Sequence, residues 1–510
     1  MQNKAQALCL LFIVVGIFLR VDNFVQNRSL RDDEALYFEC LVSRTPTEVL
    51  LNEKYNLISP PSPIGFSFIE REIMDHGGYS EYALRFIPFI FSLGGLLLFY
   101  YLVSQYFSSW TTLWATGLFA LSNQLIFFSA DMRPYSIEVF FAILALWMSN
   151  RLVNNVRLSD CLCFGAMSAV SVWFSYTVVF ILGGVAIASL GVSLFKKQWG
   201  NFYKLLLIHG CWAISFFLVF KYTIHPILKA GITNHMWQRF FFHGPHDVIN
   251  IFADPLGIIS PTLGLFWFLA GVFYLYNINN KKLALAIIPI ILTLIAALCK
   301  KYPFSGRVLL FLVPSLLIFI ALGLEALGEG FKGKMKGAYI ILVLGIFFIP
   351  PLIQNVEDMA YGWDHEDARS AAYFLKNNML PDDVLLMNNE ARYPLGYYMG
   401  RFKIDMKDRW VGIIPEILFK KTEYPAQARC VFEQFNFDMR GFLIGIGFYT
   451  DRPQYMIYRD QWLKVKYKRE WLLLINAPED LRIFLEGSMG NEKGTHRHII
   501  FKGADLYLLS

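Results

Sequence analysis

The sequence predicts a polytopic α-helical membrane protein with a smaller α/β domain after its last membrane span. Three observations lead to this class. Of the 510 residues, 55% are hydrophobic and only 17% are charged, whereas soluble proteins carry about a quarter charged residues. Apolar runs of about 20 residues, long enough to cross a bilayer as helices, recur over residues 1–355. Beyond them the composition becomes that of a folded aqueous domain.

About eleven membrane spans are expected. The first carries no small-residue cleavage site after it, so we expect a retained helix and not a removed signal peptide. The spans are predicted at 4–21, 84–105, 109–130, 134–154, 159–175, 177–195, 202–222, 258–277, 281–299, 307–327 and 336–354.

The basic residues of the short loops predict the orientation, because Lys and Arg concentrate on the cytoplasmic side. With the N-terminus in the cytoplasm, the cytoplasmic loops hold Arg151, Arg157, Lys196, Lys197, Lys204, Lys281, Lys282, Lys332, Lys334 and Lys336. An odd number of spans then places residues 356–510 outside. We expect an integral protein of a bacterial inner (plasma) membrane, with a cytoplasmic N-terminus and an extracytoplasmic C-terminal domain.

The same orientation puts four loops rich in polar residues on the outer face. They are "RDDEALYFE" at 31–39, "SADMRPYS" at 129–136, the loop 223–257, and "KKYPFSGR" at 300–307. The last has three basic residues in eight, against the general trend. Such an exception favours an anionic ligand near the membrane surface, although anchoring of Lys and Arg in the headgroup layer would give the same pattern.

Candidate chemical groups stand in the first two of these loops. Asp32, Asp33 and Glu34 are either solvated carboxylates or a binding and proton-handling site, since a carboxylate beside a low-dielectric slab is easily tuned as a base. Asp131 precedes an expected helix start at Pro134, so it is either a helix-end anion or a ligand contact. Arg133 is a forked donor suited to phosphate or carboxylate.

The loop 223–257 combines histidines and aromatic residues. It contains His225, His235, His243, His246 and Trp237. His243 and His246 with Asp247 could bind a divalent metal, but the Gly-Pro between the histidines is not a known zinc spacing. We therefore expect no certain cofactor, with a divalent metal possible, and favour aromatic stacking on a sugar or contact with membrane lipids. The seven scattered cysteines form no recognisable framework, and we expect no nucleic-acid partner.

Residues 356–510 are expected to form the soluble α/β domain. The stretch 367–389 has the pattern of an amphipathic helix, a Pro-Asp-Asp turn and a buried strand. Further strands are expected at 441–450, at 471–476 and as a terminal pair in 497–510. No catalytic motif is present there, so this domain is expected to bind or shield something.

The motifs of residues 1–355 resemble those of a known family. An Asp-Glu dyad in "DEALY" follows the first helix, and "ISPPSPIGF" (58–66) comes next. "SEYALRFIPFIFSLGGLLLFYYL" (80–102), "DMRPYSIEVFFAILAL" (131–146) and "GRVLLFLVPSLLIFIALGLEAL" (306–327) open later helices. In order and spacing they resemble the GT-C glycosyltransferases, in particular the group of protein O-mannosyltransferases and the aminoarabinose transferase of lipid A.

This resemblance implies a function and roles for the matching residues. It implies an inverting glycosyltransferase that moves a sugar from a polyprenyl-phosphate donor to a glycan, lipid or protein acceptor outside the membrane. Asp33 would be the general base, with Glu34 beside it. The candidates for the donor phosphate are Arg307, Lys301, Lys300 and Arg133, and those for other substrate contacts are Asp131, Tyr135, Asp32, His243 and His246.

One feature departs from the family pattern, and two other functions stay open. Aminoarabinose transferases carry a basic residue before the Pro-Pro element, where this chain has Ser59 before Pro60-Pro61. This departure puts the transferase subtype in doubt. A lipid-linked sugar flippase or a non-catalytic envelope glycan assembly protein would also be polytopic, but transporters usually carry internal repeats and charges at mid-membrane depth.

Overall fold

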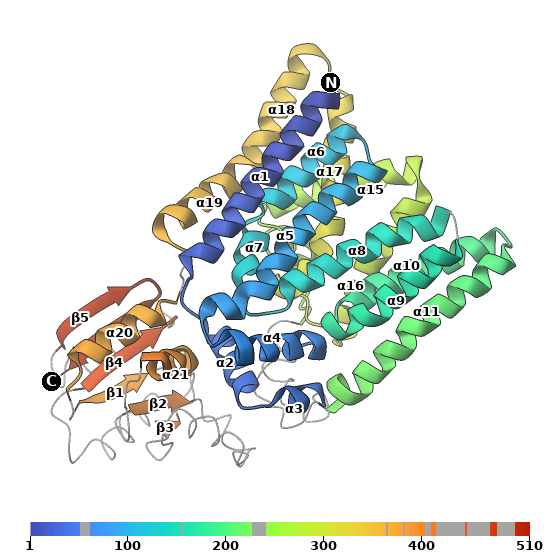
Figure 1. The fold of residues 1–510 in the computed structure, drawn as a ribbon. Helices are drawn as coiled ribbons and strands as arrows, with labels where there is room; N and C mark the ends of the chain where they lie inside the picture. The colour runs from blue at the N-terminus through green and yellow to red at the C-terminus, as the bar shows by residue number, and fades with distance from the viewer. Residues whose placement is uncertain are drawn as a thin grey trace. The chain divides into compact units, whose positions relative to one another are not determined.

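The computed structural model describes ten stretches of the chain (Figure 1). They are 2–51, 62–154, 157–226, 241–363, 366–380, 383–387, 389–402, 410–414, 470–476 and 495–509, with residues 444–445 in addition. The chain divides into two compact units: Met1–Gln26 with Pro60–Gly362, and Asn27–Ser59 with Trp363–Ser510. The Pro60-Pro61 element, His235 and Trp237 lie outside the described residues.

The first unit is helical throughout. Its helices are α1 (Gln2–Gln26), α4 (Ile64–Gly77), α5 (Glu81–Tyr106), α6 (Ser109–Leu121), α7 (Asn123–Phe127), η1 (Phe128–Ala130), α8 (Tyr135–Asn154), α9 (Leu158–Phe174), α10 (Val178–Phe195), α11 (Trp199–Val219), η2 (Phe220–Ile224), α14 (Pro245–Asn250), α15 (Pro261–Ile278), α16 (Asn280–Leu298), η4 (Gly306–Leu312), α17 (Val313–Glu329), α18 (Gly333–Phe347) and α19 (Ile349–Tyr361).

Every predicted span coincides with a helix, but fewer helices than expected can cross a membrane by length and composition. Eight of the described helices can do so, and a bent pair, Ser109–Leu121 with Asn123–Ala130, makes a ninth. Helix α9 has only 17 residues, which reach about 25 Å at 1.5 Å per residue and so fall short of a hydrocarbon core of about 30 Å. Helix α8 is the other predicted span that does not meet the criterion, so the described part holds eight or nine such helices against the eleven expected.

Close helix packing fixes the centre of this unit. The span Gly306–Glu329, which contains α17, has 94% of its most apolar window buried inside the protein. It meets α15 through glycines: a Cβ on Gly271 would stand 1.8 Å from the carbonyl oxygen of Phe319, and one on Gly323 would stand 2.1 Å from that of Trp267. Small residues let membrane helices approach this closely.

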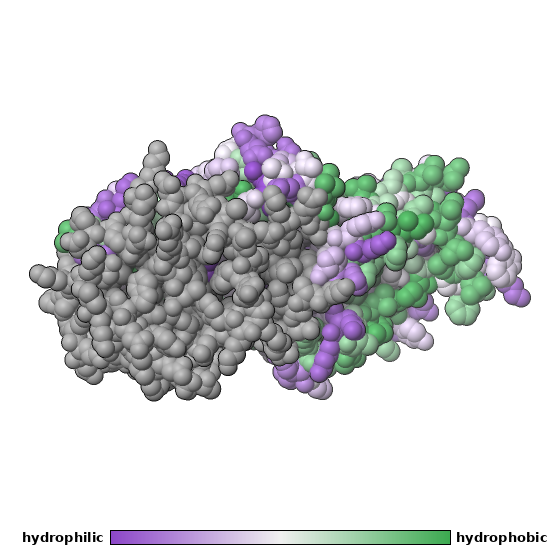
Figure 2. Space-filling model, turned by 90° about the horizontal axis from the view of Figure 1, so that it is seen from below, coloured by the Kyte–Doolittle hydropathy of each residue, from purple (hydrophilic) through white to green (hydrophobic). Residues whose placement is uncertain are grey.

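The outer helices expose their apolar side chains. Phe195 is 91% exposed, Leu207 74%, Ile341 72% and Phe273 70%. Figure 2 shows hydrophobic residues over much of the visible helical surface. A water-soluble protein rarely exposes such large apolar areas, and lipid would cover them without cost. The chain is an integral membrane protein.

The second unit contains a six-stranded sheet. Its elements are α2 (Asp32–Val42), α3 (Pro46–Leu50), α20 (Ala368–Asn378), β1 (Val384–Met387), α21 (Asn389–Phe402), β2 (Trp410–Ile414), β3 (Ile444–Gly445), β4 (Glu470–Ile475), β5 (Thr495–Phe501) and β6 (Ala504–Leu509). The strand order is β3-β2-β1-β4-β6-β5. Strands β3, β2, β1 and β4 are parallel, and β6 pairs antiparallel with β4 and β5.

The small C-terminal α/β domain expected from the sequence is present. Asp383, in the predicted Pro-Asp-Asp turn, accepts hydrogen bonds from the backbone N–H of Leu380 at 2.9 Å and from the indole N–H of Trp471 at 2.8 Å. The turn is thereby tied to β4. The segment 27–51 belongs to this unit as well: Tyr398 on α21 accepts a hydrogen bond from the N–H of Leu30 at 2.9 Å, and Phe38 packs edge-on against Tyr397.

Candidate active site

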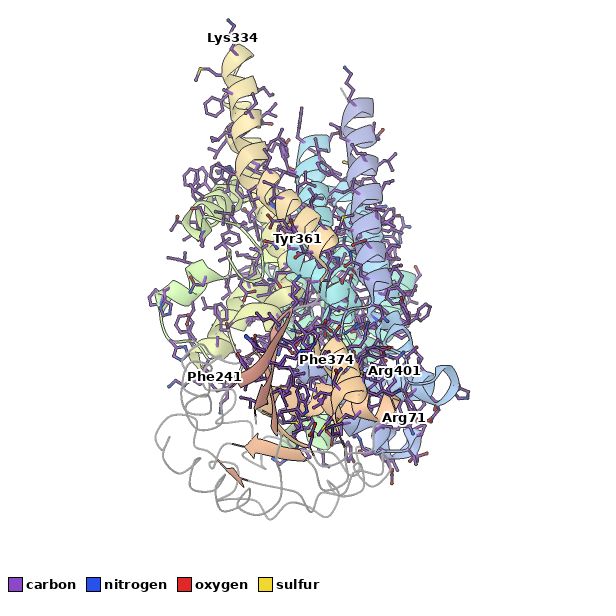
Figure 3. The ribbon with its side chains drawn as sticks, turned by 90° about the vertical axis from the view of Figure 1, so that its left-hand side faces the viewer. Arg71, Phe241, Lys334, Tyr361, Phe374 and Arg401 are labelled. Atoms are coloured by element: carbon purple, nitrogen blue, oxygen red, sulfur yellow. The ribbon has the colours of Figure 1, made fainter. Side chains whose placement is uncertain are left out.

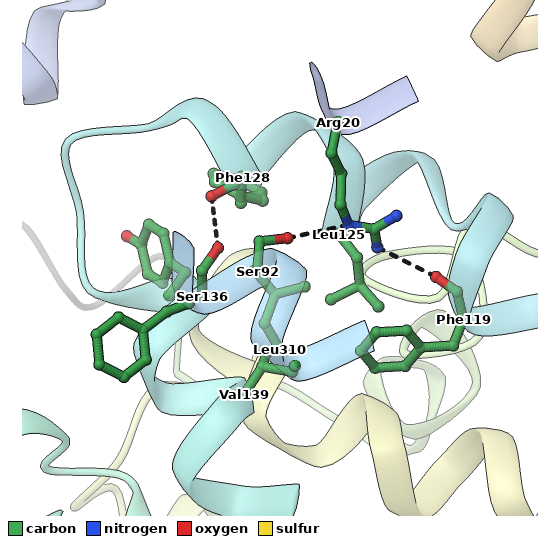
Figure 4. A pocket seen from close by; sticks show the side chains of 11 residues that line it. Arg20, Ser92, Phe119, Leu125, Phe128, Ser136, Val139 and Leu310 are labelled. Atoms are coloured by element: carbon green, nitrogen blue, oxygen red, sulfur yellow. Dashed lines mark hydrogen bonds between the residues drawn. The ribbon is translucent and has the colours of Figure 1, made fainter. Parts of the chain in front are cut away.

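The bent span α6–α7 leads into the loop 128–135, and α1 supports the bend. Breaking a helix leaves backbone carbonyls without intrahelical partners. Arg20 on α1, fully buried, donates from Nη1 to the carbonyl of Ala120 at 3.1 Å and from Nη2 to that of Phe119 at 3.3 Å (Figure 4). Its Nε donates to the hydroxyl of Ser92 on α5 at 3.0 Å. The guanidinium thus caps the end of α6.

Two asparagines complete this support. Asn23 on α1 donates to the carbonyls of Ile126 at 2.7 Å and Phe127 at 3.1 Å, at the end of α7. Asn355 on α19 donates to the carbonyl of Leu121 at 3.0 Å. The broken span is therefore held on both sides of its 52° bend, which fixes where the loop with Asp131 and Arg133 begins.

We call Arg20, Asn23 and Asn355 the brace. A small cavity lies between the brace and the start of α8. Arg20, Ser92, Tyr135 and Ser136 are among its lining residues, and its volume is about 10 Å³ (Figure 4). That is room for no more than a single water. The cavity is a packing feature between the brace and the loop, and it is too small to hold a substrate.

Polar side chains from three loops come together where α8 begins, and we call this group the polar cluster. Its members are Arg133, Tyr135, Glu138, Asp254, Tyr302 and Arg307. Each has an electrostatic or ring contact with another member, although the segment 133–138 precedes the other two by over 100 residues in sequence.

Arg307 is held from two sides. Its guanidinium carbon lies 5.8 Å from the centre of the Tyr135 ring, a cation–π distance. Asp254 also faces it: burial raises the pKa of Asp254 above its usual value, and the charge of Arg307 opposes that rise. Gly306, at φ +56°, brings the two together, because a Cβ there would stand 2.8 Å from Asp254 Oδ2.

Arg133 is buried, with 4% of its surface exposed, and acts electrostatically on Glu138 one turn into α8. Its backbone N–H donates to the carbonyl of Asp131 at 2.7 Å, which makes a tight turn before the helix. Tyr302 donates from its hydroxyl to the carbonyl of Val308 at 2.7 Å. Burial raises the pKa of Tyr302 far above its usual value, so it stays a neutral donor.

For the other predicted basic residues and the histidines, the structure shows no contact with the polar cluster among the described residues. Lys300 and Lys301 are exposed at the end of α16. Asp247 accepts hydrogen bonds from the backbone N–H groups of His243 at 2.6 Å and Gly244 at 3.3 Å, so it caps α14, and its Oδ1 lies 3.0 Å from His246 Nε2. Within the described residues, no group of three or more His, Cys, Asp or Glu side chains is placed to hold a metal.

The acidic residues of α2, in the second unit, have different environments. Glu34 is fully buried and accepts hydrogen bonds from Arg28 Nη1 at 2.8 Å and from the N–H of Arg31 at 3.1 Å, so its charge is compensated and its position is fixed. The side chain of Asp33 is 16% exposed, and its Oδ1 lies 3.5 Å from Arg31 Nη2. Of the two carboxylates of the dyad, Asp33 is the more exposed.

Sequence reasoning missed two residues around α2. Glu366 Oε2 accepts the backbone N–H of Asp32 at 3.0 Å, and burial raises the pKa of Glu366. Arg369 donates from Nη2 to the carbonyls of Asn27 at 2.5 Å and Arg28 at 3.0 Å. Both follow α2 by over 300 positions and stand in no motif, so only the folded chain connects them with it.

Comparisons with known proteins find one matching family profile and solved structures of similar fold. The family profile described as "Dolichyl-phosphate-mannose-protein mannosyltransferase" matches residues 61–224. The crystal structure of ArnT from Cupriavidus metallidurans bound to undecaprenyl phosphate superposes with a TM-score of 0.55 at 11% identity, covering 98% of this chain and 97% of that chain. The apo state gives 0.54 at 12% identity, covering 99% and 98%. No curated protein matches the sequence significantly.

The structural likeness establishes a shared fold over nearly the whole length of both chains. The fold and the matched profile together confirm the resemblance to GT-C glycosyltransferases that the sequence motifs predicted. The chain is a helical membrane protein that shares the fold of these structures.

Proposed function

We propose that the chain is an inverting glycosyltransferase that takes a sugar from a polyprenyl-phosphate donor and attaches it to an acceptor on the extracytoplasmic side of the membrane. The observation that carries the proposal is Arg307, held between the Tyr135 ring and Asp254 in the polar cluster. The ArnT structure with bound undecaprenyl phosphate, which shares the fold, supports a lipid-phosphate donor.

The loop charges support the proposed sidedness. Figure 1 draws the N-terminus and the start of α18 at the same end of the helical unit, and Lys334 lies at this end of α18 in Figure 3, whereas Tyr361 lies at the opposite end of α19. Positive residues mark the cytoplasmic side. The loops that supply Arg133 and Arg307 alternate with the basic loops along the chain, and so belong to the outer face in this proposal.

The donor half of the reaction needs positive charge at the leaving group. As the bond between the sugar C1 and the phosphate oxygen breaks, its electron pair passes to the phosphate. Arg307 and Arg133 are fixed, forked donors that would bind that oxygen more tightly as its charge grows. Because Arg133 is buried and Arg307 is held by its neighbours, neither has to reorganise during the reaction.

The acceptor half needs one base. The acceptor hydroxyl or amine loses its proton as it attacks C1 from the face opposite the phosphate, and the carboxylate of Asp33 would take that proton. A single base is enough for inversion at a glycosyl phosphate, because the phosphate leaves without a proton. Glu34, bonded to Arg28 and to the N–H of Arg31, would orient α2 and not react.

The test is sugar transfer by the purified protein, with polyprenyl-phosphate mannose and polyprenyl-phosphate aminoarabinose as alternative donors. Arg307→Ala should raise the KM for the donor about tenfold or more, since a charge-assisted hydrogen bond of ~1.5–3 kcal/mol is lost, and Arg307→Lys should restore part of it. Asp33→Asn should abolish turnover while donor binding persists.

Glu48→Gln, an isosteric change at the exposed cap of α3, is the matched control. Normal turnover in Asp33→Asn would overturn the assignment of the base, and donor binding unchanged in Arg307→Ala would overturn the phosphate site.

A further inference from the structure

An open groove of about 390 Å³ lies along α20 in the second unit. Three segments supply aromatic rings to it: Tyr373 and Phe374 from α20, Phe402 from the end of α21, and Phe501 from the end of β5. Figure 3 labels Phe374 on its helix. Tyr373 is 58% exposed, and its ring lies 6.0 Å from that of Phe402.

Cations stand over these rings. Arg497 lies 5.2 Å from the ring of Phe374, and Lys376 lies 5.9 Å from the ring of Phe402. Arg369 lines the groove itself. No acidic side chain is among the described residues that line it. The groove is therefore aromatic in its walls and positive around its rim.

Short polar side chains complete the lining. Asn377, Asn378 and Ser370 stand on α20 beside the rings. Asn378 is fixed by a hydrogen bond from its Nδ2 to the carbonyl of Phe374 at 2.9 Å. Amides and hydroxyls both donate and accept, so they match the hydroxyl groups of a sugar, which also do both. A site for a purely apolar ligand would not need them.

We propose that this groove binds an anionic carbohydrate, namely a glycan that carries phosphate or carboxylate groups. The aromatic faces would cover the C–H faces of the sugar rings, the amides would meet the hydroxyls, and the cations Lys376 and Arg497 would meet the acidic groups. That the bound glycan is the acceptor of the transfer reaction rests on the proposed function. The binding itself does not, because it needs neither donor nor turnover.

The test is equilibrium binding to the full-length protein in nanodiscs of neutral phosphatidylcholine. The probe is a fluorescent phosphorylated mannan oligosaccharide, compared with the same oligosaccharide after phosphatase treatment. We expect binding of the phosphorylated form and at least tenfold weaker binding of the neutral one. Tyr373→Ala should weaken binding about tenfold, the loss typical of an aromatic anchor. Lys376→Glu should weaken it further, and Lys376→Arg should keep it.

Ile500→Ala is the matched control. Ile500 is 73% exposed and precedes Phe501 on β5, so its side chain points to the opposite face of the strand. This variant should bind like the wild type. Equal binding of the two oligosaccharides, no binding of either, or unchanged binding in Tyr373→Ala and Lys376→Glu would each overturn the proposal. Binding to phosphatidylserine nanodiscs that competes with the glycan and exceeds it in affinity would overturn it in favour of a membrane surface. None of these binding measurements depends on sugar transfer, so the groove proposal and the proposed transferase activity can fail independently of each other.

Discussion

Arg20 on α1 and Ala120 at the end of α6 are joined by a 3.1 Å hydrogen bond from the guanidinium to the backbone carbonyl. The other end of α6 has the opposite charge: Glu325 on α17 accepts hydrogen bonds from the hydroxyls of Ser108, at 2.6 Å, and Thr111. A carboxylate at a helix N-terminus and a cation at its C-terminus both complement the helix dipole. The buried helix before the bend is thus stabilised at both ends by its neighbours.

The first prediction concerns this brace. Arg20→Met leaves the carbonyls of Ala120 and Phe119 buried without their donor, so we expect the free energy of unfolding to fall by about 2–4 kcal/mol. Thermal unfolding in a neutral detergent measures it. Ser92→Ala removes only one of the bonds of Arg20 and should cost about 1 kcal/mol. An Arg20→Met protein that melts at the wild-type temperature would show that the bend does not need the cap.

The second prediction concerns the contact between α15 and α17. In Gly271→Ala the new methyl would overlap the carbonyl of Phe319 at 1.8 Å, so the helices must separate, and we expect a large loss of folded protein. Gly345→Ala on α18 meets no atom within 4 Å and should be neutral. The measurement is the monodisperse fraction in size-exclusion chromatography. Equal yields for the two variants would contradict this account of the packing.

The third prediction concerns the positioning of Arg307. In Gly306→Ala the Cβ would press on Asp254 at 2.8 Å, so Asp254 should move and the KM for the donor should rise with little change in kcat. Gly257→Ala is the matched control, because Gly257 also has a positive φ, +75°, but open space around it. Both variants carry the same backbone strain of about 1–2 kcal/mol. A rise in KM of equal size in both would assign the effect to strain and not to Asp254.

The fourth prediction is a pH dependence in the second unit. Burial raises the pKa of Glu39 from 4.5 to about 7, with Arg392 opposing the shift. The folded state therefore holds a proton that the unfolded state releases between these values, and the stability contribution present at low pH is lost as the pH rises through about 7. Glu39→Gln should raise the melting temperature relative to the wild type at pH 8 and change it little at pH 5. The opposite order would mean that Glu39 is charged in the folded protein.

Much of the fold follows from local pattern. A run of apolar residues must be helical in lipid, because no water is present to pair with its backbone groups, and each of the eleven predicted spans falls on a helix. Two predicted spans do not meet the criterion of length and composition: α9 ends at Phe174 after 17 residues, and α8, which is long enough, carries Glu138 in its first turn and Arg151 in its last. The bend after Leu121 was also not predicted, since residues 109–130 read as one apolar run.

The candidate site, like the fold, was only partly predictable from the sequence. Motif order pointed to Asp33, Arg133 and Arg307, and their roles stay predictions. Nothing in the sequence pointed to Asp254 beside Arg307, or to Glu366 beside Asp32, because those contacts join segments that no motif connects.

The sequence by itself determined that this protein is a polytopic helical membrane protein whose motifs resemble those of the GT-C glycosyltransferases, because hydropathy and the order of short motifs are properties of the chain. Only the tertiary structure decided which charges are compensated. In the sequence Arg20 stands at the polar end of the first span. In the folded protein it donates hydrogen bonds to backbone carbonyls at the end of α6, where the span bends. Whether a charged group serves stability or chemistry depends on its partners, and partners distant along the chain meet only when the helices pack.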